Sequence, residues 1–196
     1  MAASPSASRS ADTRTKLIDA ALVVVARDGL GEANVKAIAQ EAGVTAGLLH
    51  YHFASKDELL FAAVERAGEE YIAALDALIA GNPPERLFDA YTAFSHAALH
   101  DHRPLFALRL ALAVRAINEP AISARLAGAD AAIAERLGSV LARHAGRAEA
   151  GEEDRVAARM IKAAFEGLML SWLSRPGFPM EAALTRFAGL MRSALG

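Results

Sequence analysis

The stretch of sequence that decides the fold covers residues 34–56 and reads N-V-K-A-I-A-Q-E-A-G-V-T-A-G-L-L-H-Y-H-F-A-S-K. Asn34 is a favourable N-cap, which predicts that a helix begins at Val35. Gly43 supplies the left-handed backbone that ends this helix. Thr45 is the next N-cap, so a second helix opens after a very short turn. This spacing is typical of a helix-turn-helix, whose second helix lies in the major groove of DNA.

Outside this stretch, proline and glycine residues divide the chain into segments of helix length. Alanine, the strongest helix former, accounts for 47 of the 196 residues, while β-branched and aromatic residues are sparse. The fold class is therefore predicted to be all-α. The predicted helices cover residues 12–27, 35–42, 46–52, 56–79, 84–100, 104–117, 120–145, 152–174 and 179–195.

The first helices carry apolar residues at helical spacing, and these form a small predicted core with Leu49 and Phe53. Three regions are expected: a disordered tail over residues 1–10, a DNA-binding domain over 11–56, and a larger domain over 57–196.

Composition excludes several classes of protein. The chain has no cysteine, so disulfide scaffolds, cysteine-zinc modules and thiol enzymes are ruled out. No apolar run is long enough to span a bilayer, and the first ten residues lack the apolar core of a secretory signal, so we expect a cytoplasmic protein without membrane contact. No H-E-x-x-H motif, Glu-x-x-His pair or phosphate loop is present, so we do not expect an enzyme.

Residues 29–60 resemble the DNA-binding end of the TetR (tetracycline-repressor-like) family of bacterial transcriptional regulators. The resemblance is carried, at the family's spacing, by Gly29, Val35, Ile38-Ala39, Ala42-Gly43-Val44, Gly47, Leu49, Phe53, Ser55-Lys56 and Leu59-Leu60. It implies three DNA-binding helices followed by a six-helix bundle for effector binding and dimerisation. It also implies a homodimeric regulator, a repressor, that binds a palindromic operator and is released by a small, largely apolar effector, with no cofactor.

Nine residues are candidates for contact with DNA: Lys36, Thr45, Ala46, Gly47, Leu48, His50, Tyr51, His52 and Lys56. Lys56 follows the N-cap Ser55, so its ammonium group and the amides of the helix attract a phosphate together. Gly47 lets the backbone approach DNA closely. Ala46 and Leu48 can touch thymine methyl groups but cannot read hydrogen-bond patterns.

Several of these residues also have a purely structural alternative. Thr45 is equally explained as a cap, Leu48 as a core residue, and Tyr51 and His52 as ordinary surface residues. His50 stands where the family usually carries a tyrosine that contacts phosphate. Lys36 and Arg14 are candidates for the DNA backbone or for a solvated surface.

The larger domain is rich in bulky side chains, and the resemblance implies a ligand pocket within it. The effector-binding candidates are Phe88, Tyr91, Phe94, Phe106, Arg109, Leu110, Phe165, Met169 and Trp172. The possible polar anchors are His96, Arg109, Arg115, Asn118 and Glu166. Core packing is the alternative for each aromatic side chain, and a DNA-binding protein without a small-molecule effector is the alternative function.

The last two predicted helices correspond to the pair that forms the dimer in the family. The dimer-interface candidates are Val156, Met160, Ala164, Gly167 and Ser171, a mixture of small and apolar side chains. His96, His100 and His102 raise the further alternative of a metal-responsive regulator, although a solvated helix end explains them better, and no metal site is expected.

The formal charge of −2 is an average over two unequal parts. Residues 1–56 carry six basic and five acidic residues, for a net charge of +1, while residues 57–196 carry fifteen and eighteen, for a net charge of −3. Phosphate neutralisation dominates affinity for DNA, so a DNA-binding domain with so small a positive charge binds weakly by itself. Two such domains acting together on a palindrome are therefore favoured.

Overall fold

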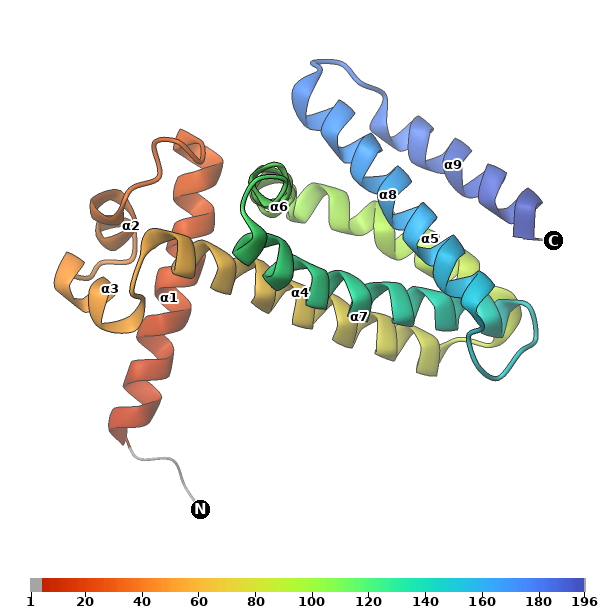
Figure 1. The fold of residues 1–196 in the computed structure, drawn as a ribbon, viewed down its shortest axis with the longest axis horizontal. Helices are drawn as coiled ribbons and strands as arrows, with labels where there is room; N and C mark the ends of the chain where they lie inside the picture. The colour runs from red at the N-terminus through yellow and green to blue at the C-terminus, as the bar shows by residue number, and fades with distance from the viewer. Residues whose placement is uncertain (1–4, 196) are drawn as a thin grey trace. The chain divides into compact units, whose positions relative to one another are not determined.

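The computed structural model describes residues 5–195, and it describes side chains over residues 10–99 and 102–193. Within residues 5–195 the chain is all-helical, with nine α-helices (Figure 1), which confirms the predicted class. The helices are α1 (Pro5–Asp28), α2 (Val35–Glu41), α3 (Ala46–His52), α4 (Lys56–Gly81), α5 (Pro84–Asp101), α6 (Arg103–Ala116), α7 (Pro120–His144), α8 (Glu152–Ser174) and α9 (Met180–Leu195).

The start of α1 differs from the prediction. The sequence places residues 1–10 in a disordered tail, but α1 already begins at Pro5, and residues 1–4 lie outside the described part of the chain. Proline is tolerated in the first turn of a helix, and the serine and alanine residues that follow it do not end one. The tail was predicted because no apolar periodicity marks these turns, and the side chains of residues 10–12 are indeed exposed.

The chain divides into two compact units. The first contains α1, α2, α3, the start of α4 as far as Ala67, and Arg103–Ala111 of α6, while the second contains Gly68–His102 and the chain from Leu112 onward. The division therefore falls inside α4, whereas the sequence places the functional boundary between residues 56 and 57. That functional boundary stays a prediction.

The first unit has a small core built from one face of each of its helices. In this unit α1 packs on α2, and α2 packs on α3. The largest fully buried side chains contributed by α1 to α4 are Leu17, Ile18, Ile38, Leu49, Phe53, Leu59 and Leu60. Burial of Leu49, in the middle of α3, and of Phe53, directly after its last residue, confirms the predicted core.

The second unit is organised around α7. Here α7 packs on α5 and α8, and α9 lies against α5 and α8 (Figure 1). Its buried core consists of Leu87, Ala134, Leu137, Val140, Leu141, Ala158 and Ile161. No helix over residues 5–195 combines the length and the apolar character needed to cross a membrane.

A buried carboxylate closes the loop between α7 and α8. Asp154 is only 5% exposed, and its Oδ2 accepts the backbone N–H of Gly151 at 2.8 Å. Arg147 donates to both carboxylate oxygens, with Nη2 2.6 Å from Oδ1. The Arg147 guanidinium and the Gly151 amide hold the pKa of Asp154 below its usual value against the opposing effect of burial. The loop is thereby tied to the first turn of α8.

We expect Asp154→Asn to destabilise the protein at pH 7 by roughly 1 kcal/mol, because a neutral amide makes weaker hydrogen bonds than a carboxylate. The pKa of Asp154 is depressed in the folded state, so its contribution is complete above the unfolded pKa, near 4, and is lost as the pH falls through the folded pKa. Urea unfolding of both proteins from pH 7 to pH 3 should show the difference shrinking below about pH 4.

The matched control is Glu153→Gln, which removes the neighbouring exposed carboxylate. It should leave stability nearly unchanged. Equal stability of Asp154→Asn and the unaltered chain at pH 7 would contradict the assignment.

Candidate functional site

The turn between α2 and α3 has the backbone geometry predicted from the sequence. Gly43 has a φ of +67°, in the left-handed region, and its N–H donates to the Gln40 carbonyl at 3.1 Å. The Val44 N–H donates to the Ala39 carbonyl at 2.9 Å. These two bonds form a Schellman motif, which ends α2 and turns the chain toward α3.

Side-chain caps define where the helices of this motif begin. The Asn34 Oδ1 accepts the Ala37 N–H at 3.0 Å, and the Thr45 Oγ1 accepts the Leu48 N–H at 3.2 Å. Both predicted caps are therefore confirmed. Because its hydroxyl already accepts a bond inside the helix, Thr45 has the hydroxyl proton left to offer outside it.

Helix α3 places one leucine inside and the other outside. Leu49 is fully buried, whereas Leu48 is 38% exposed, which contradicts the alternative that Leu48 is a core residue. The side chains of Ala46 and His50 and the backbone of Gly47 are exposed, and Tyr51 is 79% exposed. His52 is half-buried, with its ring against the edge of Tyr51 at a centroid distance of 5.2 Å. The predicted DNA-contact residues of α3 thus lie on the surface around one buried anchor.

Basic side chains surround this helix. Lys56 is the first residue of α4, and the Ser55 hydroxyl caps that helix by accepting the Glu58 N–H at 3.1 Å. Lys56 is half-buried, and Lys36 on α2 is exposed. The Arg14 guanidinium lies over the Phe53 ring, 5.0 Å from its centroid, directly beside the end of α3.

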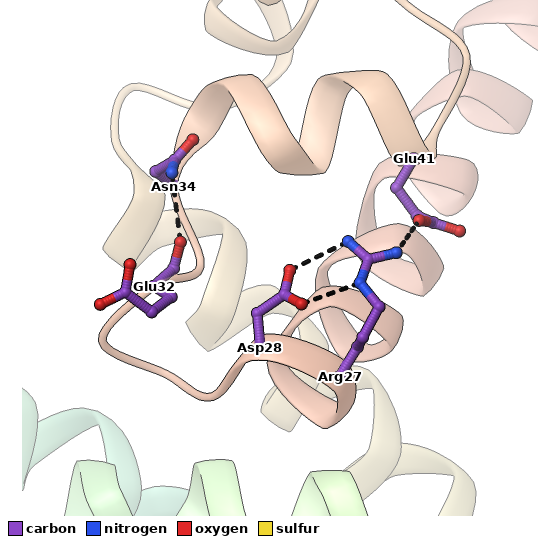
Figure 2. Close-up of polar contacts among 5 residues, drawn as sticks. All are labelled: Arg27, Asp28, Glu32, Asn34 and Glu41. Atoms are coloured by element: carbon purple, nitrogen blue, oxygen red, sulfur yellow. Dashed lines mark hydrogen bonds and ion pairs between the residues drawn. The ribbon is translucent and has the colours of Figure 1, made fainter.

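An ion cluster links the end of α1 to the end of α2 (Figure 2). The Arg27 Nε and Nη2 each donate to one oxygen of Asp28 at 2.9 Å, and its Nη1 donates to Glu41 Oε2 at 2.8 Å. The Asp28 and Glu41 carboxylates raise the pKa of the Arg27 guanidinium above its ordinary value. Glu41 is the last residue of α2, so this cluster holds the helix next to the turn.

Sequence reasoning does not identify the cluster of Arg27, Asp28 and Glu41. Arg27 and Glu41 are fourteen positions apart and lie on different helices, so no local spacing pairs them. The last turns of α1 and α2 come together only through tertiary packing.

A small apolar cavity lies in the second unit, between α5, α8 and α9. Its volume is about 30 Å³, and it is lined by Phe88, Tyr91, Thr92, Ser95, His96, Ile161, Phe165, Leu184, Phe187, Ala188 and Met191. Three of the nine effector-binding candidates, Phe88, Tyr91 and Phe165, belong to this lining, as does the predicted polar anchor His96.

The other six candidates do not line this cavity. Phe106, Arg109 and Leu110 belong to the first compact unit. Met169 is buried, the ring of Phe94 packs against Tyr71 at 5.2 Å, and Trp172 is half-buried. The sequence analysis does not predict that α9 lines the cavity. Leu184, Phe187 and Met191 share one face of that helix, and this apolar spacing was the available signal.

The polar groups at this cavity are neutral hydroxyls and an imidazole. The Tyr71 and Tyr91 hydroxyls lie 3.4 Å apart, and burial raises the pKa of both. The Thr92 and Ser95 hydroxyls donate to carbonyls one turn earlier in α5, each at 2.9 Å. No Lys, Arg, Asp or Glu side chain takes part in the described lining, so the cavity suits an uncharged molecule.

An exposed apolar stripe runs along α8. Val156 is 44% exposed, Met160 67% and Leu170 56%, and Ala163 and Gly167 complete the stripe at alternating steps of four and three residues. Three of its members, Val156, Met160 and Leu170, are large apolar side chains that are left exposed. The stripe includes three of the five predicted interface residues, Val156, Met160 and Gly167. The other two, Ala164 and Ser171, are half-buried, and Ala163 and Leu170 take their places in the stripe.

The metal alternative concerns His96, His100 and His102. The side chain of His100 lies outside those described, while His96 lines the cavity and His102 follows the last residue of α5.

Comparison with known proteins identifies relatives of the first unit. Residues 17–63 match the family model described as bacterial regulatory proteins, tetR family. The nicotine-responsive transcriptional repressor HdnoR of Paenarthrobacter nicotinovorans is 35% identical over 75 residues, 38% of this chain and 39% of that protein. The first curated relatives are matched over only 25% to 40% of their length. The transcriptional repressor KstR of Mycolicibacterium smegmatis is 28% identical over 166 residues, 84% of this chain and 78% of that protein.

Solved structures resemble this chain over most of its length. A transcriptional regulator from Rhodococcus sp. Rha1 has a TM-score of 0.73 at 25% identity, covering 92% of this chain and 96% of that one. A TetR transcription regulator from Haloarcula marismortui has a TM-score of 0.80 at 16% identity, covering 94% and 98%, which shows likeness of fold.

Proposed function

Because this chain belongs to the TetR family of bacterial transcriptional regulators, we propose that it is a homodimeric repressor that binds a palindromic operator in the cytoplasm. We propose further that a small, largely apolar molecule releases it from DNA. The family is one of regulators and not of enzymes, in agreement with the sequence prediction. Two relatives, HdnoR and KstR, are named repressors, which supports the direction of regulation.

One observation carries the DNA-binding proposal: α3 is anchored by the buried Leu49 and presents Leu48, His50 and Tyr51 to solvent. A recognition helix needs this division, because its exposed face enters the major groove while its inner face holds its angle. Lys56 begins the next helix. It adds a point charge where the first amides of α4 also face outward, and both attract a phosphate.

We expect selection from random duplex DNA to yield an inverted repeat, and Lys56→Ala to bind every selected sequence more weakly. The salt slope of binding should fall by about one per subunit, because one phosphate contact is lost. Mobility-shift titrations from 50 to 200 mM salt, roughly the range over which such contacts weaken, measure both quantities. Arg86→Ala, at an exposed position on α5, is the matched control and should change neither. An unchanged slope for Lys56→Ala would exclude the contact.

The α8 stripe supports the dimer. An isologous dimer needs a self-complementary patch, and an apolar stripe repeating every three and four residues packs readily on a copy of itself. Gly167 lies within the stripe with open space where a Cβ would stand, which permits two helix backbones to approach closely. Leu190 on α9 is a further large apolar side chain that is 55% exposed.

We expect Met160→Glu to convert the dimer into a monomer of 20.6 kDa. Burial of each methionine is worth roughly 1.5–3 kcal/mol, and symmetry removes two, so the dimer dissociation constant should rise by at least about a hundredfold. Sedimentation equilibrium measures it. Ala124→Glu, at an exposed position of α7, should leave the dimer intact. Persistence of the dimer in Met160→Glu would place the interface elsewhere.

The cavity between α5, α8 and α9 supports the effector proposal. Its lining is apolar apart from neutral hydroxyls and the His96 ring, which matches an uncharged molecule with one or two hydrogen-bonding groups. Its volume of about 30 Å³ is far below the roughly 300–1,000 Å³ of typical ligand pockets, so a ligand must widen it by moving side chains of α5, α8 and α9.

We expect a thermal-shift screen of uncharged aromatic and aliphatic compounds to yield ligands that raise the melting temperature and lower DNA binding. A ligand at a hundred times its Kd stabilises the folded state by about 2.7 kcal/mol. Ala188→Leu fills the cavity and should abolish the shift while DNA binding is kept. Ala182→Leu, at an exposed position of α9, is the control. An undiminished shift in Ala188→Leu would mean that the ligand binds elsewhere.

A further inference from the structure

The recognition helix lacks the side chains that most often read base edges by paired hydrogen bonds. Residues 45–52 contain no arginine, lysine, asparagine, glutamine or carboxylate. The bidentate contacts that select guanine or adenine come from arginine or lysine and from asparagine or glutamine, respectively. The hydrogen-bonding side chains of α3 are two histidines and Tyr51, so another kind of contact must supply part of the sequence information.

Leu48 occupies the position from which such a contact is possible. It is the third residue of α3, and the N-terminal residues of a recognition helix face the base edges. Its neighbour Leu49 is fully buried and fixes the rotation of the helix, which leaves the side chain of Leu48 38% exposed.

The surroundings of Leu48 leave room for a close approach. Its backbone N–H is bonded to Thr45 Oγ1, so the first turn is rigid at this point. Gly47 beside it has no side chain, and the sole atom within 4 Å of where its Cβ would stand is Thr45 Oγ1 at 3.9 Å. The surface beside Leu48 is therefore open at Gly47.

We propose that Leu48 reads thymine, by packing its branched end against the C5-methyl group in the major groove. This inference rests on the proposed DNA binding. Among the four bases of DNA only thymine presents a methyl group in the major groove, so an apolar contact there distinguishes an A·T pair from a G·C pair without hydrogen bonds. The operator half-site then contains at least one thymine whose methyl group, and not its hydrogen-bonding edge, is recognised.

The test pairs a change in the protein with a change in the DNA. The probe is the operator that the unaltered chain selects from random duplexes. A set of variant operators is then made, each with one thymine replaced by deoxyuridine, which removes only the methyl group. For at least one thymine of the half-site, the unaltered protein should lose about fourfold in affinity per methyl group, the usual worth of burying one such group.

Leu48→Ala should bind the thymine and uracil operators equally well, because the methyl group then has no partner. Leu48→Met keeps a long apolar side chain and should keep the sensitivity. Val23→Ala, at a 48% exposed position on α1, is a matched control that should also keep it. Melting curves of each variant exclude loss of folding as the cause.

The possible outcomes distinguish a failure of this inference from a failure of the proposed DNA binding. Failure to select any operator would overturn the proposed DNA binding, and the inference with it. A selected operator that tolerates uracil at every thymine, or a half-site without thymine on either strand, would overturn the inference alone. Equal uracil sensitivity in Leu48→Ala and the unaltered protein would assign the methyl contact to another residue.

Discussion

The helix-turn-helix of the first unit depends on one left-handed residue. Gly43 turns the chain so that α3 leaves α2 at a fixed angle, with Val44 and Gly43 bonded back to α2. A residue with a Cβ would be strained at that φ. Once the turn is set, the position of Leu49 in the core follows, and with it the side of α3 that carries Leu48 and Tyr51. The ion cluster of Arg27, Asp28 and Glu41 joins the end of α1 to the last residue of α2, next to this turn.

Most helix bounds were predictable because the signals for them are local. Proline at the first turn, glycine after the last and Asn, Thr or Ser at the caps act within a few residues, and the predicted ends agree with the structure to within two residues, apart from the start of α1. Only intrinsic helix propensity marks the start of α1, because the first described side chains of this helix face solvent and show no apolar spacing.

The candidate sites were predictable to different degrees for the same reason. The exposed face of α3 follows from its spacing, because one buried leucine determines the rest. The cavity does not, since its walls come from three helices distant in sequence and depend on how α9 lies against α5 and α8. The ion pairs of Arg27 with Glu41 and of Arg192 with Asp89 join residues that no local rule connects.

The small volume of the cavity has a consequence for the proposed response to an effector. If the form that accepts a ligand is only a minor fraction of the molecules, the apparent Kd is the intrinsic one divided by that fraction. The packing of Leu184, Phe187 and Met191 against α5 and α8 then sets a concentration threshold. Tighter packing would raise the effector concentration needed for a response, and looser packing would lower it, without any change in the groups that touch the ligand.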